Sequence, residues 1–232
     1  MKVLEPLQRP FYAVIRPLVG WLLKSGVHPN TITTFGAALV IASGAAYGIG
    51  DFRYGGLLLL LSGLVDTLDG QVAREGRKTS AFGAFYDSTL DRVGDGASFI
   101  GIGAWLLWAP DVQWRFQAVV LAMVTILLSL LVSYTRARAE GLGIDCKVGI
   151  AQRAERIVGL GLLTLVFGPG PRGLVVTGVM ALLSLLSFIT VIQRFHHVYR
   201  TTRHRAPDDL PVVKPTSRGD ARRALDPVAK RT

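Results

Sequence analysis

The chain has 232 residues, is half hydrophobic and carries a formal charge of +10 at pH 7. It contains several runs of about 20 residues with almost no charge, enough to cross ~30 Å of hydrocarbon as a helix, which excludes an ordinary soluble domain. Basic loops on the cytoplasmic side of a multispan protein explain the positive charge better than nucleic-acid binding does.

The N-terminal segment is predicted to form an amphipathic helix. Residues 4–24 are interrupted by charges, but their apolar side chains recur at helical spacing. Such a juxtamembrane helix, within residues 1–25, lies either on the membrane surface or against the protein, and the sequence leaves both open. Pro10 and Pro17 are expected to bend it. After Pro29, either Asn30 or Thr31 can cap the next helix.

Six apolar segments follow, and their lack of period-two alternation favours helices over barrel strands. They lie at about 31–49, 54–74, 81–108, 115–135, 156–168 and 174–193. The first is rich in small residues, which let a neighbouring helix approach closely. The fifth is short unless the preceding loop adds a helical turn.

The predicted fold class is therefore an all-α integral membrane protein, with six transmembrane helices preceded by an amphipathic juxtamembrane helix. This domain covers residues 1–198. Residues 199–232 are basic and poor in apolar side chains, which predicts a disordered cytoplasmic tail.

The positive charges predict the orientation in the membrane. Six spans place both termini on one side, and 22 of the 26 Lys and Arg residues fall on that side. The other four are Arg53, Arg92, Arg115 and Arg172. By the positive-inside rule the side of the termini is cytoplasmic. The loop between the second and third spans faces the same side, so a site there opens to the cytoplasm.

Four aspartates flank that loop and are candidate metal ligands. Asp66 and Asp69 are three residues apart, and Asp87 and Asp91 are four apart, so each pair shares a helix face. Counted from Lys78, Asp69 and Asp87 lie at one depth, and Asp66 and Asp91 lie about one turn deeper. Charged groups are costly in a bilayer and carboxylates repel one another, so bound cations are expected. Oxygen-only ligation favours one or two Mg²⁺ or Mn²⁺ ions.

Neighbouring residues suggest phosphate chemistry at the same place. Gly70 directly follows Asp69 and would let a phosphate approach the helix backbone, and Arg74 lies one turn further on the same face. An alternative in which the acids only pair with Arg74 and Arg92 fits less well, because four acids would share two bases. Asp95 continues the acidic face and is expected to be hydrogen-bonded or paired with an arginine rather than to be a metal ligand.

The order Asp66-x2-Asp69-Gly70-x2-Ala73-Arg74-x8-Gly83-x3-Asp87-x3-Asp91 resembles the complete signature of the CDP-alcohol phosphotransferases, with eight fixed positions in 26 residues. The resemblance covers about residues 1–198. It implies that the four aspartates surround the metal ions, that Asp91 is also the general base, and that the protein is a homodimer. It further implies contacts to the CDP-lipid donor from these residues: Pro29, Asn30, Thr31, Ile32, Gly70, Arg74 and Ser80.

Arginines further along the chain suggest an acceptor that carries its own phosphate. Four of them lie at the ends of later spans on the cytoplasmic side: Arg136, Arg138, Arg156 and Arg194. The alternative is that they only follow the positive-inside rule, and this is the interpretation we favour for Lys147 and Arg153.

The segment SYTRARAE, followed by a glycine-bearing loop and ERI, resembles the bacterial phosphatidylinositol phosphate synthases. There the matching positions bind the phosphate of inositol phosphate, although Arg136 stands where a lysine is typical. The predicted function is transfer of a phosphatidyl group from CDP-diacylglycerol to inositol phosphate in the cell membrane. The alternatives are glycerol 3-phosphate as acceptor, a membrane cation transporter, and a non-catalytic membrane scaffold. Membrane lipids and a second copy of the chain are the other predicted partners.

Overall fold

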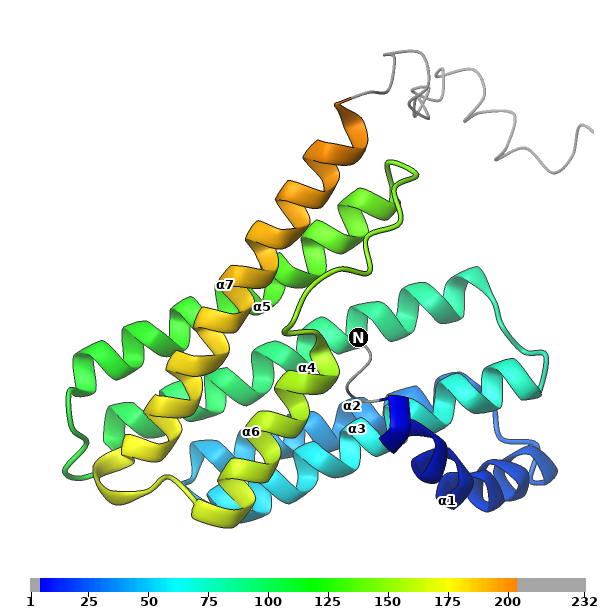
Figure 1. Cartoon of the computed structure of the whole chain (residues 1–232). Coiled ribbons are helices and arrows are strands. Elements are labelled where there is room, and N and C mark those ends of the chain that lie inside the picture. The colour runs from blue at the N-terminus through cyan, green and yellow to red at the C-terminus, as the bar shows by residue number, and fades with distance from the viewer. Residues whose placement is uncertain (1–4, 204–232) are drawn as a thin grey trace, which may run out of the picture.

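The structure is a computed structural model that describes the backbone of residues 5–203 and the side chains from Ile15 onward. All its regular elements within that range are helical, which confirms the predicted all-α class (Figure 1). The elements are α1 (Glu5–Lys24), α2 (Pro29–Gly48), α3 (Phe52–Glu75), α4 (Ala81–Trp108), α5 (Arg115–Glu140), α6 (Arg153–Phe167), the 3-10 turn η1 (Pro171–Gly173) and α7 (Leu174–Thr202).

Four of the helical segments are long and apolar enough to cross a membrane. They are α2, α3, α5 and the continuous stretch Pro171–Thr202 formed by η1 and α7. Helix α4 has 28 residues but carries several charged side chains, and α6 has only 15 residues. By length and composition the structure therefore supports a multispan membrane protein with four clear spans.

Three helix ends differ from the predicted ones by three residues or more. Helix α5 continues to Glu140, so Arg136 and Arg138 lie on the helix itself. Helix α6 begins at Arg153, because the loop adds the helical turn that a short span required. Helix α7 runs to Thr202, so residues 199–202 of the predicted tail are helical, while 204–232 lie outside the described residues.

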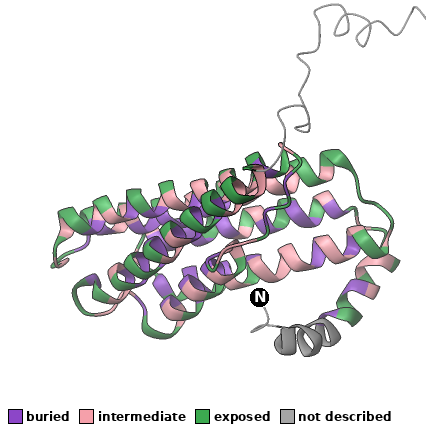
Figure 2. Cartoon of the chain, turned by 45° about the horizontal axis from the view of Figure 1, so that its top comes forward, coloured by how far each residue is buried: buried purple, intermediate pink, exposed green. Residues whose placement is uncertain are grey.

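The six α-helices from α2 to α7 form a ring. Each packs mainly against two others, in the cyclic order α2, α4, α5, α7, α6 and α3. In Figure 1 the α5–α7 pair leans away from α2 and α3, and the start of α6 lies between the two groups. Buried residues line the inward faces of the helices, as Figure 2 shows. The start of α6 therefore lies between the α5–α7 pair and the helices α2 and α3.

Small residues bring the helices close together, as the composition predicted. A Cβ placed on Gly101 of α4 would lie 1.9 Å from the carbonyl oxygen of Gly44 on α2, so any larger side chain would force the helices apart. A Cβ on Gly56 of α3 would lie 2.6 Å from the carbonyl oxygen of Gly161 on α6. These two close approaches fix the spacing of α2 to α4 and of α3 to α6.

Helix α1 runs through Pro10 and Pro17 as one helix and packs on the protein with its C-terminal half. Ile15 and Val19 are buried against α2 and α3. Trp21 remains 62% exposed on the other side. The C-terminal half of α1 therefore packs against the protein, which was one of the two predicted alternatives.

Side-chain caps fix the helix starts near the acidic segment. His28 caps α2 by accepting a hydrogen bond from the backbone N–H of Asn30, so the predicted caps Asn30 and Thr31 are wrong, because α2 begins at Pro29. Ser80 caps α4 by accepting from the N–H of Gly83 at 2.9 Å. Both caps leave the helix starts of α2 and α4 beside the end of α3.

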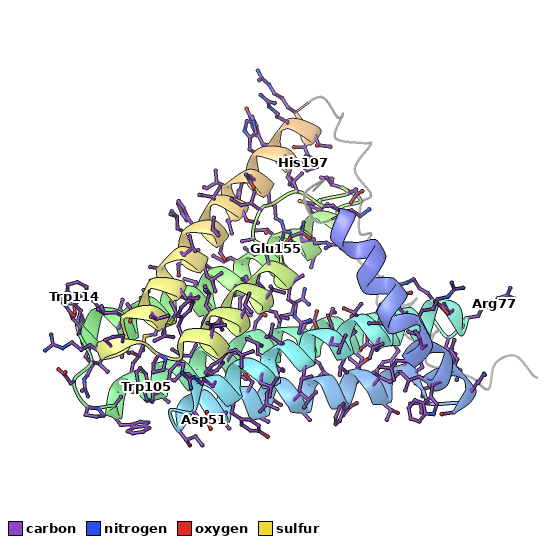
Figure 3. The ribbon with its side chains drawn as sticks, turned by 60° about the horizontal axis from the view of Figure 1, so that its bottom comes forward. Asp51, Arg77, Trp105, Trp114, Glu155 and His197 are labelled. Atoms are coloured by element: carbon purple, nitrogen blue, oxygen red, sulfur yellow. The ribbon has the colours of Figure 1, made fainter. Side chains whose placement is uncertain are left out.

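The two ends of the ring differ in their side chains. Asp51, Trp105 and Trp114 lie together at one end, and Arg77 lies at the other end, at the turn between α3 and α4 (Figure 3). The aspartates of α3 and α4 belong to the Arg77 end, because Asp69 and Asp87 are the members of each helix nearest to that turn.

Candidate active site

Three aspartate side chains meet between α3 and α4. Asp66 and Asp69 of α3 and Asp87 of α4 each offer a carboxylate oxygen, and these oxygens lie within 4.8 Å of one another. Asp69 is 6% exposed, while Asp66 and Asp87 are partly buried. The matched depth of Asp69 and Asp87, counted from the loop, is what allows side chains on opposite sides of the hairpin to converge.

Unpaired oxygens in this group fit a divalent metal ion. Asp69 Oδ2 and Asp87 Oδ1 are buried and have no hydrogen-bond partner within the described part of the chain. A buried carboxylate oxygen without a partner is costly, and a cation satisfies it. A donor set made only of carboxylate oxygens suits Mg²⁺ or Mn²⁺.

Asp91, one turn deeper on α4, is held by arginines. Arg153 Nη1 lies 2.9 Å from Asp91 Oδ1 and donates at 2.8 Å to Asp66 Oδ2. Arg92 Nη1 lies 3.6 Å from the other oxygen of Asp91. Asp66 therefore belongs both to the carboxylate triad and to the ion pairs at the deeper level.

The interpretation of Arg153 as a surface charge is wrong. Its side chain is 21% exposed, and its guanidinium lies among the carboxylates. Two signals in the sequence pointed to this: Arg153 and Arg156 share a helix face at i,i+3, and an acidic face on α4 needed basic partners. Lys147, the other residue of that interpretation, lies on the surface 3.0 Å from Asp145.

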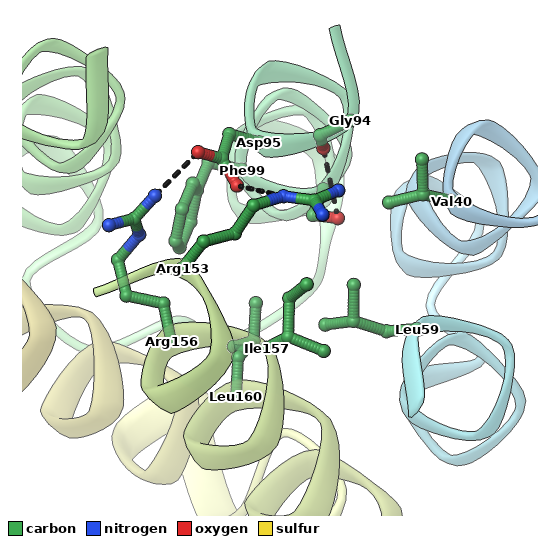
Figure 4. A pocket seen from close by; sticks show the side chains of 10 residues that line it. Val40, Leu59, Gly94, Asp95, Phe99, Arg153, Arg156, Ile157 and Leu160 are labelled. Atoms are coloured by element: carbon green, nitrogen blue, oxygen red, sulfur yellow. Dashed lines mark hydrogen bonds and ion pairs between the residues drawn. The ribbon is translucent and has the colours of Figure 1, made fainter. Parts of the chain in front are cut away.

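Asp95 forms a buried ion pair below the carboxylates. Arg156 Nη2 lies 2.5 Å from Asp95 Oδ2, and the two side chains are 3% and 7% exposed. Arg153 Nε is 3.8 Å from the other oxygen. Figure 4 shows both arginines reaching from α6 to Asp95 on α4. The prediction that Asp95 pairs with an arginine is confirmed.

A pocket of about 130 Å³ opens beside Asp69 and Asp87, on the side of the α3–α4 turn. Four of the residues predicted to contact the CDP-lipid line it: Pro29, Asn30, Gly70 and Ser80. Arg74 folds over Gly70, because a Cβ on Gly70 would lie 3.2 Å from Arg74 Nη1. A helix start and two carboxylates therefore border one small cavity, and the Arg74 guanidinium lies next to Gly70 in its lining.

Other residues predicted for the donor lie elsewhere. Thr31 is exposed, and Ile32 is buried in the apolar cluster under α1; neither lines the pocket. Thr33, Lys78 and Thr79 do line it, and the sequence reasoning missed them. Thr33 lies one helical turn after Pro29 and donates to its carbonyl oxygen at 3.2 Å, so helical periodicity was the available signal.

The four arginines predicted for the acceptor divide into two groups. Arg194 is buried, and its guanidinium donates to the carbonyl oxygens of Val148 at 2.9 Å and of Val132. Val132 is one helical turn before Arg136 on α5, and Arg156 Nη1 donates to Ala151 in the same loop as Val148, so the three arginines lie around one end of this loop. Arg136 also pairs with Glu140 at 2.8 Å.

Arg138 faces a different space. It lies on α5 beside a hollow of about 290 Å³ between α5 and α7, which Arg194 also borders. Two residues along a helix turn the side chain by about 200°, which separates Arg138 from Arg136. The i,i+2 spacing in the sequence already implied this separation.

A family model described as CDP-alcohol phosphatidyltransferase matches residues 26–193. The chain belongs to this family. The predicted resemblance is therefore confirmed, and the chain is a phospholipid-synthesising transferase of the CDP-alcohol phosphatidyltransferase family.

Characterised relatives share most of the chain. It is 37% identical over 202 residues to the archaetidylinositol phosphate synthase of Methanothermobacter thermautotrophicus, covering 84% of this chain and 96% of that protein. It is 38% identical over 188 residues to the phosphatidylinositol phosphate synthase of Mycolicibacterium smegmatis, covering 79% and 82%.

A solved structure of the Mycobacterium tuberculosis phosphatidylinositol phosphate synthase with CDP-DAG bound has a TM-score of 0.68 and 32% identity. It covers 79% of this chain and 92% of that one. The same enzyme in complex with manganese and citrate also has a TM-score of 0.68. Together with the carboxylate triad, this supports a divalent-metal site in the present CDP-alcohol phosphatidyltransferase.

Proposed function

We propose that this chain transfers the phosphatidyl group of CDP-diacylglycerol to a hydroxyl of inositol phosphate, giving phosphatidylinositol phosphate and CMP. The observation that carries the proposal is the carboxylate triad beside the pocket lined by Gly70 and Ser80, in a chain related to inositol phosphate-using synthases. These relatives favour inositol phosphate over glycerol 3-phosphate. Membership of a transferase family disfavours the cation transporter and the scaffold.

We assign the donor to the 130 Å³ pocket. Pro29, Asn30, Gly70 and Ser80 border it, and Arg74 is placed to pair with the diphosphate because its guanidinium lies over Gly70. Thr31 and Ile32 do not line the pocket, and we assign them an indirect role because they belong to the first turn of α2, which borders it. Lys78 and Thr79 are additional candidates for donor contacts.

We assign two divalent ions, Mg²⁺ or Mn²⁺, to Asp66, Asp69, Asp87 and Asp91. When bound, such ions neutralise charge on the diphosphate and on departing CMP. The unpaired oxygens of Asp69 and Asp87 support this assignment. We include Asp91 because it and Asp66 contact the same guanidinium, that of Arg153.

Asp91 is assigned as the general base. It takes the proton from the acceptor hydroxyl, whose oxygen attacks the lipid-linked phosphorus. The bond between that phosphorus and the oxygen of the CMP phosphate breaks in the same step, and CMP leaves with the electron pair of that bond. Arg92 and Arg153 orient the carboxylate. A carboxylate is a weak base, so proton transfer comes late, as metaphosphate-like character develops at phosphorus.

The acceptor phosphate is assigned to the arginines on the α5–α6–α7 side. Arg136, Arg156 and Arg194 lie around the loop before α6 and supply the positive charge. Arg138 is the outer member, because it borders the hollow between α5 and α7, where Arg194 is the other arginine in the lining. The buried pairing of Arg156 with Asp95 suggests that Arg156 orients the group rather than binding the phosphate through both nitrogens.

The proposed topology has six spans, with α4 and α6 completing the four clear ones. Both termini and the active site are then cytoplasmic in the cell membrane, since most Lys and Arg residues fall on that side. The tryptophans at the opposite end suit the far membrane interface. Residues 1–198 would form the catalytic domain and the remainder a cytoplasmic tail. A homodimer is proposed from the family resemblance.

The test is CMP release by purified protein with CDP-diacylglycerol and Mg²⁺, comparing inositol phosphate, glycerol 3-phosphate and free inositol. We expect inositol phosphate to give the highest rate. Absence of CMP release with every acceptor would reject the transferase. A higher rate with glycerol 3-phosphate would reject the acceptor assignment while keeping the reaction.

A further inference from the structure

A buried hydroxyl group of α7 binds the loop before α6. Thr190 is fully buried, and its Oγ1 accepts hydrogen bonds from the backbone N–H groups of Ile150 at 3.2 Å and Ala151 at 3.0 Å. The hydroxyl proton is already used, since it is donated to the carbonyl oxygen of Leu186 at 2.9 Å. Both lone-pair directions of the oxygen are therefore available to the loop.

The backbone passes directly over the Thr190 side chain. Gly149 has a φ of +131°, which L side chains rarely adopt, and a Cβ there would lie 2.4 Å from Thr190 Cγ2. The glycine therefore lets the loop come close enough for the two N–H groups that follow it to reach the hydroxyl.

Two arginines hold the carbonyl groups of the same short segment. Arg194 Nε donates to the carbonyl oxygen of Val148 at 2.9 Å, and Arg156 Nη1 donates to that of Ala151 at 3.2 Å. Of these partners, Thr190 and Arg194 belong to α7. The loop has no regular structure here, so these side-chain contacts determine where its backbone lies.

The segment held in this way leads directly to the acidic site. Ala151 is two residues before Arg153, which is the first residue of α6. A shift of the segment moves Arg153 relative to Asp66 and Asp91, which its guanidinium now bridges at 2.8 and 2.9 Å. A guanidinium at that distance satisfies carboxylates that a divalent cation would otherwise bind, so it weakens cation binding.

We propose that Thr190 is a positioning residue for the active site: by holding the N–H groups of Ile150 and Ala151, it places Arg153 on Asp66 and Asp91 and so sets the affinity of the carboxylates for divalent metal. Thr190 touches neither carboxylate and acts only through the loop. The inference rests on the proposed function in taking these aspartates as metal ligands.

The experiment measures Mn²⁺ binding to the full-length protein in lipid nanodiscs without substrates, by the electron paramagnetic resonance signal of free Mn²⁺. Thr190→Val keeps the shape of the side chain and removes the hydroxyl. We expect its dissociation constant for Mn²⁺ to be at least about threefold lower than that of wild type, because the positive charge of Arg153 moves away from the carboxylates. Thr190→Ser keeps the hydroxyl and should bind as wild type does. Arg153→Gln should shift in the same direction as Thr190→Val.

A matched control distinguishes positioning from general loosening of the helices. Thr125 of α5 is equally buried and shares a 2.7 Å hydrogen bond with Ser184 on α7, away from the loop. Thr125→Val should lower the unfolding temperature but leave Mn²⁺ binding unchanged. The double variant Thr190→Val with Arg153→Gln should bind no more tightly than Arg153→Gln alone, because both changes remove the same effect.

Wild-type affinity in folded Thr190→Val would overturn the proposal, and so would an additive shift in the double variant. If Thr190→Val does not fold, Gly149→Ala replaces it, since the added methyl pushes the loop away from Thr190; wild-type affinity there would overturn the proposal equally. CMP release is assayed in parallel. If wild-type protein binds Mn²⁺ but releases no CMP, the proposed function is rejected and this inference is not. If wild-type protein binds no Mn²⁺, this inference is rejected.

Discussion

Arg156 of α6 and Asp95 of α4 form an ion pair of 2.5 Å between two side chains that are almost fully buried. The pair lies next to Arg153, which continues the same face of α6 toward the carboxylates of α3 and α4. Together with the contacts of Arg153, it links α6 to the helices that carry the acids.

Removing one partner of this pair should destabilise the protein strongly. Arg156→Leu leaves the Asp95 charge buried without its partner, which costs about 3–5 kcal/mol in comparable cases. The double variant with Asp95→Leu removes both charges and should regain much of the lost stability. The measurement is the unfolding temperature of detergent-purified protein. A double variant less stable than either single one would contradict the explanation.

Asp69→Asn and Asp87→Asn should each abolish metal-dependent turnover, because each removes a charge from the pair of unpaired oxygens. We expect CMP release to fall by on the order of 10²-fold or more, together with loss of Mn²⁺ binding. Asp145→Asn is the control, since Asp145 is exposed and pairs only with Lys147 on the surface. Retained Mn²⁺ binding in both site variants would place the metal elsewhere.

Asp91→Asn should abolish turnover while leaving donor binding largely intact. The amide keeps the size of the side chain but cannot accept the proton of the acceptor hydroxyl, and general-base catalysis contributes about 10²–10⁴-fold. Single-turnover CMP release and binding of CDP-diacylglycerol are measured on the same sample. An active Asp91→Asn enzyme would show that another group is the base.

Arg74→Ala should raise KM for CDP-diacylglycerol and leave KM for the acceptor unchanged. Arg74 lies over Gly70 at the donor pocket, and loss of a charge-assisted hydrogen bond to a phosphate costs about tenfold or more in affinity. Arg77→Ala is the matched control, because Arg77 is exposed at the nearby turn. Equal effects of the two changes would point to general electrostatics rather than to a donor contact.

Cys146 should react slowly with maleimide in the native protein and quickly after denaturation. The residue is fully buried in the loop between α5 and α6, and this burial raises the pKa of its thiol. A raised pKa leaves less of the reactive thiolate at any pH below it, so the native rate should stay low at pH 7 to 8. Mass spectrometry of the labelled protein gives both rates. Rapid native labelling would mean that this loop opens.

The positions of the helices could be predicted because long apolar runs and turn residues are local features of the sequence. The ends of α5 and α7 could not be, because Val198 and Ala139 gain contacts from the loop between α5 and α6 only once the chain is folded. The count of residues along the α3–α4 hairpin predicted that Asp69 and Asp87 would meet. It could not show that an arginine from α6 would separate Asp91 from the triad, since that contact spans more than 60 residues.

Arg153 shows the limit of charge counting. Its charge fits the positive-inside rule as well as that of Lys147 does, yet one side chain lies among aspartates and the other on the surface. In the sequence, only the i,i+3 spacing to Arg156 and the extra acid at Asp95 distinguish Arg153 from Lys147. Both features can be interpreted only once α6 is known to pack against α3.

The pocket assigned to the nucleotide lipid and the arginines assigned to the acceptor come from different stretches of the chain. The pocket assigned to the nucleotide lipid is built from α2, α3, α4 and the turn between them, whereas the four arginines all follow the 109–114 connection. We therefore expect changes at these arginines to alter which alcohol is accepted while the nucleotide-lipid pocket stays intact. Chimeras joined at residues 109–114 would exchange acceptor preference between relatives, provided that the contact between Asp95 and Arg156 is kept.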